Sequence, residues 1–285
     1  MRNRIWVTRM LINFEQKFSE YLKTYIHDHH IDEETMEDVV PDLYLKWLDT
    51  QQNWIGGVSP NAYFSAMDAV SLIKMLGQYL LTDITLPGPL LNRIADNRCE
   101  TYPLLISLLK NYSGESEDKI RTVIVRLIEE MDMDHPYDYY VDVISQTNEQ
   151  TDFSEACADE LRDAGPNYVE TVMSSFEQTE HPYAMDCFLD ILTDMPYDER
   201  TYGYAMERFL LSDTQKAFYA NCLGKIGNPA AIPALEESLR QENLRYFDYV
   251  AIRNALEELG GEVDIDRDFT GDKDYDSLID LEKRH

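Results

Sequence analysis

The stretch Cys222-Leu-Gly-Lys-Ile-Gly-Asn-Pro-Ala-Ala-Ile-Pro-Ala-Leu235 decides the fold class of this 285-residue chain. It contains the end of one helix, a break, and the beginning of the next helix. Gly227 suits the left-handed residue that closes a helix, and Pro229 suits the first turn of the following one. A similar helix ending recurs with Leu256, 33 residues after Leu223. The sequence therefore predicts stacked pairs of helices here.

Small and large apolar residues alternate at helical spacing on both sides of this break. We expect the small residues to let neighbouring helices approach, and the large ones to fill the space between layers of helices. The small residues are Ala220, Ala251 and Ala255, and the large ones are Leu223, Ile226, Leu256 and Leu259.

Over residues 213–261 the chain resembles the HEAT-like helical repeats of the phycobilisome-lyase type. Upstream, residues 158–166 and 184–192 keep the small-then-large rhythm without the full signature. The resemblance implies an all-α fold, an α-solenoid of antiparallel helix pairs whose inner helices line a concave, protein-binding face. Where the family usually has Val-Arg ahead of the inner helix, this chain has Gln215-Lys216 and Asp248-Tyr249. Only Lys216 keeps the basic character of that position.

Apolar residues recur at three-to-four spacing along almost the whole chain, which is typical of helices. We expect an N-terminal helical region over residues 1–95, the HEAT-like solenoid over 96–262 and an acidic tail over 263–285. In the first region we expect helices over about 8–30 and 32–49, with a kink or break at Pro41. Ser59 and Pro60 should begin a third helix, and Leu86-Pro-Gly-Pro89 marks the following boundary.

The net charge of the chain disfavours some classes of binding partner. The chain has 54 acidic and 25 basic residues, a formal net charge of -29. An acidic surface repels nucleic acid and anionic membranes, and no apolar run approaches the roughly 20 residues of a membrane span. We expect a cytoplasmic protein that binds a basic protein or peptide. Plain solubility, or adaptation to a salty cytoplasm, is the alternative explanation of the charge.

The resemblance also implies where a partner would bind. The solvent-facing positions of the inner helices follow the paired apolar residues, and we expect Gly224 to occupy one of them. The others form a mixed, acid-leaning groove that would receive basic residues of a partner, unless they are simply a solvated face. These candidate partner-binding residues are Arg162, Asp163, Asp190, Lys225, Glu257 and Glu258.

No arrangement of residues predicts covalent chemistry, a catalytic residue or a cofactor. The chain has no His-Glu dipeptide of the kind that HEAT-like di-iron hydroxylases use, and no GxSxG, GxGxxG or Walker motif. Its cysteines form no CxxC pair, so we expect buried thiols in a reducing compartment. They are Cys99, Cys157, Cys187 and Cys222. The sequence thus favours a non-enzymatic binding scaffold or adaptor.

The alternative function is a metal-assisted enzyme centred on residues 27–34. His27 and His30 share a helical face and are the weak metal-ligand candidates, with acidic residues close behind. No further ligand pair follows at a known spacing. A solvated helix end, where histidine suits the negative end of the dipole, is the favoured interpretation.

Two shorter patterns are weaker. Trp47 to Pro60 resembles the toxin-binding segment of a class of bacterial antitoxins, so an antitoxin- or immunity-type role is one form the binding function could take. The alternative is that Trp47, Trp54, Tyr63 and Phe64 are core aromatics. The acidic tail imitates half of a calcium loop but lacks its glycine and its final glutamate, which favours a mobile or loosely docked tail.

Overall fold

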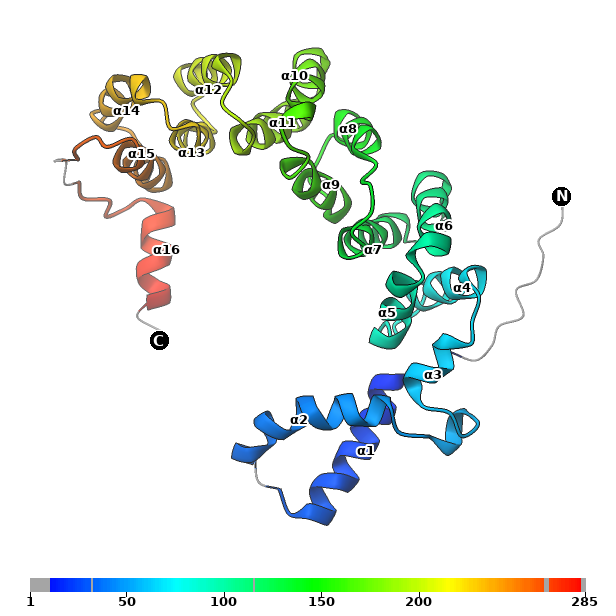
Figure 1. Cartoon of the computed structure of the whole chain (residues 1–285). Helices are drawn as coiled ribbons and strands as arrows, with labels where there is room; N and C mark the ends of the chain where they lie inside the picture. Colours follow the sequence, from blue (N-terminus) through cyan, green and yellow to red (C-terminus); the bar gives the residue numbers. More distant parts are fainter. Residues whose placement is uncertain (1–10, 32, 115, 264–266, 283–285) are drawn as a thin grey trace. The chain divides into compact units, whose positions relative to one another are not determined.

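A computed structural model describes residues 11–31, 33–114, 116–263 and 267–282. Regular structure throughout these residues is helical, with sixteen α-helices, three short 3-10 helices and one isolated bridge between Gln52 and Val58 (Figure 1). The predicted all-α class is confirmed. None of the helices described has both the length and the apolar character needed to cross a membrane.

The chain packs as two compact units, and the first comprises Met1–Pro136 with Thr151–Ala156. Its seven complete helices are α1 (Phe14–His29), α2 (Glu33–Leu48), α3 (Pro60–Ser65), α4 (Ala69–Leu80), α5 (Gly88–Asp96), α6 (Arg98–Asn111) and α7 (Glu117–Glu130). A 3-10 turn, Asn53–Ile55, precedes α3. The boundary expected at 95/96 follows from the sequence pattern and stays a prediction.

The second unit comprises Tyr137–Gln150 and Cys157–His285, so that α9 begins in the first unit and ends in the second. Short 3-10 turns, Pro166–Tyr168 and Pro229–Ala231, lead into α10 and α14. The helices are α8 (Tyr137–Ser145), α9 (Asp152–Arg162), α10 (Val169–Gln178), α11 (Pro182–Asp194), α12 (Glu199–Leu211), α13 (Lys216–Ile226), α14 (Ile232–Leu239), α15 (Tyr246–Glu258) and α16 (Lys273–Glu282).

Local signals account for most helix ends in the first unit. Helix α1 begins at Phe14, later than expected, because the Asn13 side chain caps it by accepting a hydrogen bond from the Gln16 N–H at 2.9 Å. Residues 8–10 lie outside the described residues. Of the kink or break expected at Pro41, the break does not occur, since α2 continues through it to Leu48. The predicted start at Ser59 and Pro60 is confirmed, with Ser59 capping α3.

An aromatic cluster forms part of the core of the first unit. Trp47 and Phe64 are buried, as expected for core aromatics, together with Phe14. The rings of Phe14 and Phe64 lie 5.3 Å apart, and those of Phe14 and Trp54 lie 5.7 Å apart in an edge-to-face arrangement. Trp54 remains partly exposed and Tyr63 is half-buried.

In the second unit, α11, α13 and α15 follow one another along one side, and α10, α12 and α14 lie along the other (Figure 1). Most of the predicted apolar ridge is buried: Leu223 and Leu256 are fully inaccessible and Ala255 is nearly so, but Ile226 is only half-buried. Gly227 and Gly260 adopt the expected left-handed conformation, with φ of 73° and 80°. Helix α13 packs against both α11 and α15.

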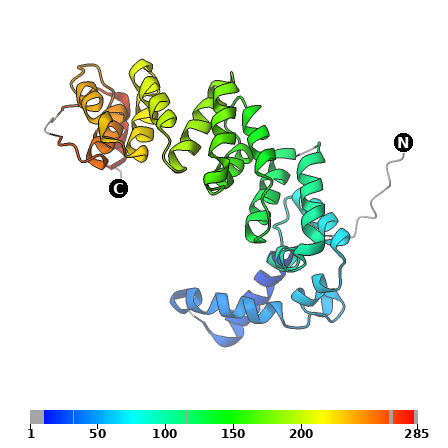
Figure 2. The same ribbon diagram turned by 45° about the horizontal axis from the view of Figure 1, so that its top comes forward.

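The expectation for the acidic tail was a mobile or a loosely docked segment, and the described residues 267–282 are docked. Phe269 is only 7% exposed, and its ring lies 5.2 Å from that of Tyr246 and 5.0 Å from that of Tyr249. The Arg267 guanidinium donates to the Leu239 carbonyl at 3.0 Å. Helix α16 consequently lies beside α15 (Figure 2).

Candidate functional site

Three of the six predicted partner-binding residues meet in a chain of ion pairs that joins three helices. Arg162 of α9 lies 2.6 Å from Asp190 of α11, whose second oxygen lies 3.1 Å from Lys225 of α13. Asp194 contacts the same two cations at 3.2 and 3.1 Å, and Asp159 contacts Arg162 at 2.7 Å. We call these five residues the charge ladder.

The charge ladder favours the ionised forms of Arg162, Asp190 and Lys225. Burial on its own raises the pKa of Asp190, but hydrogen bonds from Arg162 and Lys225 outweigh it and hold that pKa below its usual range. Burial likewise lowers the pKa of both cations, and the bonds to Asp190 reverse that effect and raise it. Three carboxylates and two cations leave little net charge. Asp190 is therefore occupied by the chain's own cations, and a basic partner would have to compete with them.

The other three predicted residues lie outside the charge ladder. Glu257 is exposed and pairs with Arg253, four residues earlier on α15, at 2.9 Å. Asp163 and Glu258 are exposed and have no ion pair among the described residues. These two carboxylates are the members of the predicted set that remain available to a basic partner.

Gly224 does not face solvent, and this expectation was wrong. It is buried where α13 meets α15, with Ala255 directly opposite. The absence of a side chain at this position lets the two helices approach closely, which is a packing role.

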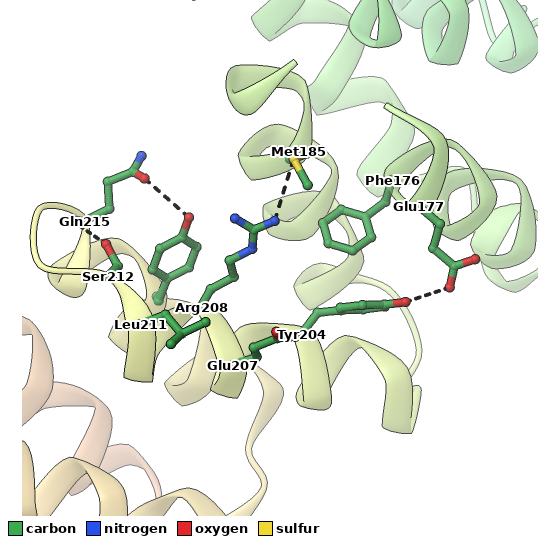
Figure 3. Close-up of a pocket in the computed structure, with 10 residues that line it drawn as sticks. Phe176, Glu177, Met185, Tyr204, Glu207, Arg208, Leu211, Ser212 and Gln215 are labelled. Atoms are coloured by element: carbon green, nitrogen blue, oxygen red, sulfur yellow. Dashed lines mark hydrogen bonds between the residues drawn. The ribbon is translucent and has the colours of Figure 1, made fainter. Parts of the chain in front are cut away.

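A groove in the second unit is lined by α10, α11, α12 and α13, and sequence reasoning missed it. Its volume is about 530 Å³ (Figure 3). Tyr204 packs edge-to-face on Phe176 at 4.8 Å and donates its hydroxyl to Glu177 at 3.0 Å. We call this recess the Arg208 groove. The residues that line it include Phe176, Glu177, Tyr204, Glu207, Arg208 and Leu211.

The cysteines show no sign of activation. Burial raises the pKa of Cys187 to about 12, so its thiol stays protonated at neutral pH. Cys157 and Cys222 are buried as expected. Cys99 is exposed and Cys187 is only half-buried, which corrects the expectation that all four are buried.

The histidine cluster lies at the end of α1. His27 is 87% exposed and its Nδ1 lies 3.1 Å from Asp28. His29 stacks on Tyr25 at 4.0 Å, and His30 closes the helix in the left-handed conformation. Asp32 and the side chains of residues 33 and 34 lie outside the described residues. Within the described ones no three metal-ligating side chains converge, so the metal-site hypothesis stays a prediction.

No family model, no curated protein and no solved structure matches this chain. Its function must therefore be inferred from its own contacts.

Proposed function

We propose that residues 96–262 form a solenoid of HEAT-like helix pairs, and that the protein is a non-enzymatic scaffold that binds a protein or peptide of basic overall charge. In a solenoid each repeat contacts only the repeats beside it. Contacts between repeats should therefore join residues that are about one repeat length apart in the sequence. Polar contacts between helices of the second unit have this spacing. Their sequence separations are 28 for Arg162–Asp190, 29 for Gln215–Asp186, 30 for Arg200–Glu170 and 31 for both Lys225–Asp194 and Arg245–Thr214.

The buried ridges also support the repeat. Leu223 and Leu256 occupy equivalent positions 33 residues apart in α13 and α15, and both are fully buried. One helix pair cannot cover such a face alone, whereas a stack of pairs shares it.

The Arg208 groove is the observation that carries the binding function. It is open to solvent and built by four successive helices, and its lining includes the exposed Leu211, which is 73% accessible. Large apolar side chains that gather at the rim of a polar groove mark sites of protein interaction. An open groove of this kind accommodates an extended peptide segment.

The basic character of the partner follows from charge. A net charge of -29 attracts a basic protein over about a Debye length and speeds its association. The unpaired carboxylates are those of Asp163, which directly follows the end of α9, and of Glu258, the last residue of α15, and both lie within the same unit as the groove. The same field opposes binding to nucleic acid.

Selection from a display library of short random peptides on the full-length chain tests this proposal. We expect basic peptides to be enriched at low salt, with affinity that falls as salt rises. Leu211→Ser should abolish enrichment of these peptides. Leu281→Ser, which changes an exposed leucine of α16 outside the groove, is the matched control and should not. Failure of wild-type protein to enrich any peptide would contradict the proposed function.

A further inference from the structure

The guanidinium of Arg208 has no carboxylate partner among the described residues, although it lies on a strongly acidic chain. It projects from α12 into the groove (Figure 3). Its one hydrogen bond there runs from Nη2 to the sulfur of Met185, at 3.7 Å. A thioether is a weak acceptor, and a guanidinium has five N–H donors. Most N–H donors of the Arg208 guanidinium therefore have no acceptor among the described residues.

Four other arginines of the second unit are closely paired with carboxylates, whereas Arg267 donates to the Leu239 carbonyl. Their distances are 2.6 Å for Arg162–Asp190, 2.8 Å for Arg200–Asp198, 2.7 Å for Arg245–Asp248 and 2.9 Å for Arg253–Glu257. A chain with 54 acidic residues offers many such partners. The lack of one at Arg208 thus needs a local cause.

The local cause is that the nearby carboxylates are bound by neutral donors. Glu177 accepts from the Tyr204 hydroxyl, and Asp186 accepts from the Tyr219 hydroxyl and the Gln215 amide, both at 2.7 Å. Both carboxylates therefore accept hydrogen bonds from Tyr204, Gln215 or Tyr219 and not from Arg208. Glu207 lies next to Arg208 on α12 and is exposed, but forms no ion pair with it.

We propose that Arg208 anchors an acidic side chain of the partner, an aspartate or glutamate that precedes or follows an apolar residue. The planar guanidinium binds a carboxylate through two parallel hydrogen bonds. The apolar neighbour would pack on Tyr204 and Leu211, at the same groove. Glu177 and Glu207 would repel a second acid, so the flanking residues should be basic, as in the partner proposed above. This inference rests on the proposed function and specifies its ligand.

The peptides recovered from the display library are the probe. Among those that bind wild-type protein, we expect one acidic position beside Leu, Phe or another apolar residue. That position should disappear from the sequences selected on Arg208→Gln. Arg240→Gln, which removes an exposed arginine at the end of α14, should select the same sequences as the wild type.

A double-mutant cycle then isolates the contact. Replacing the peptide's acid by its amide should weaken binding to wild-type protein about 10- to 100-fold, and should change nothing on Arg208→Gln. Arg208→Lys keeps the charge without the planar fork, and should show a smaller loss; it also serves if Arg208→Gln does not fold. Equal binding of acid and amide peptides to the wild type would overturn the inference while leaving the scaffold function intact. Loss of binding on amidation of the peptide C-terminus instead would also overturn it.

Discussion

Gly224 of α13 lies against the backbone of Ala255 in α15, so closely that a Cβ on Gly224 would stand 3.2 Å from the Ala255 Cα and 3.3 Å from its Cβ. Such a Cβ would also collide with the Glu258 carboxylate. The carboxylate can swing away, because it ends a flexible side chain, but a helix backbone cannot. The missing side chain therefore sets the spacing of these two helices.

Gly224→Ala should lower the free energy of unfolding by about 1–3 kcal/mol, because a methyl group is forced into a packed interface. Gly203 of α12 has open space where its Cβ would lie, so Gly203→Ala should raise that free energy by about 0.5–1 kcal/mol through better helix propensity. Urea unfolding followed by circular dichroism measures both. Equal effects of the two substitutions would show that the interface between α13 and α15 can accommodate a methyl group at residue 224.

The charge ladder predicts a second stability effect. Asp190→Asn removes the carboxylate that Arg162 and Lys225 share, and should cost about 1–3 kcal/mol at neutral pH. Asp163→Asn on the exposed surface of the unit has no ion pair to lose and should stay within about 0.5 kcal/mol of wild type. The urea midpoints of the three proteins give the comparison.

This effect should depend on pH in a stated direction. The pKa of Asp190 is lower in the folded chain than its unfolded value of about 3.9. As pH falls, the unfolded chain therefore takes up the proton first, and the folded state loses stability. The difference between wild type and Asp190→Asn should be constant above about pH 5 and shrink as pH falls below about 4. A difference that persists unchanged at low pH would mean that the charge of Asp190 is not the cause.

The sequence predicted well those features that local chemistry determines. Gly227 ends α13, Ser59 begins α3, and the ridge of Leu223 and Leu256 is buried as expected. Each of these depends on a few neighbouring residues. Pro41 was different, since α2 continues through it.

The site could be predicted only in part, because its features depend on which helices become neighbours. Spacing places Asp190 and Gly224 on their helices but does not reveal what covers them. Asp190 meets cations 28 residues before and 35 residues after it, and Gly224 meets Ala255. The Arg208 groove needs side chains from four helices at once, and no local pattern around Arg208 signals it.

Leu256 provides the test of the repeat core. It is fully buried in α15, so Leu256→Ala should cost about 2–5 kcal/mol. Leu281→Ala, on the exposed surface of α16, removes the same atoms and should be nearly neutral. A near-neutral result for Leu256 would place the ridge outside the core and contradict the stacking.

Phe269 tests whether the tail covers the end of the helical stack. Its ring packs on Tyr246 and Tyr249 of α15, and Asp272 accepts a hydrogen bond from the Tyr246 N–H at 3.2 Å. Phe269→Ala removes the buried anchor and should cost about 3 kcal/mol. Because the tail holds α15 through few contacts, this loss should appear as local opening: faster amide exchange at the start of α15 and faster proteolysis of residues 267–272.

The matched control is Leu278→Ala, which truncates an exposed leucine on α16. It should leave both exchange and proteolysis unchanged, because Leu278 is exposed, whereas Phe269 is buried. Exchange in α13 should not respond to either substitution, since α13 is covered by α15 itself. If Phe269→Ala left amide exchange in α15 at its wild-type rate, the tail would not stabilise α15. If it accelerated exchange in α13 as well, the tail would stabilise the unit as a whole rather than its last helix.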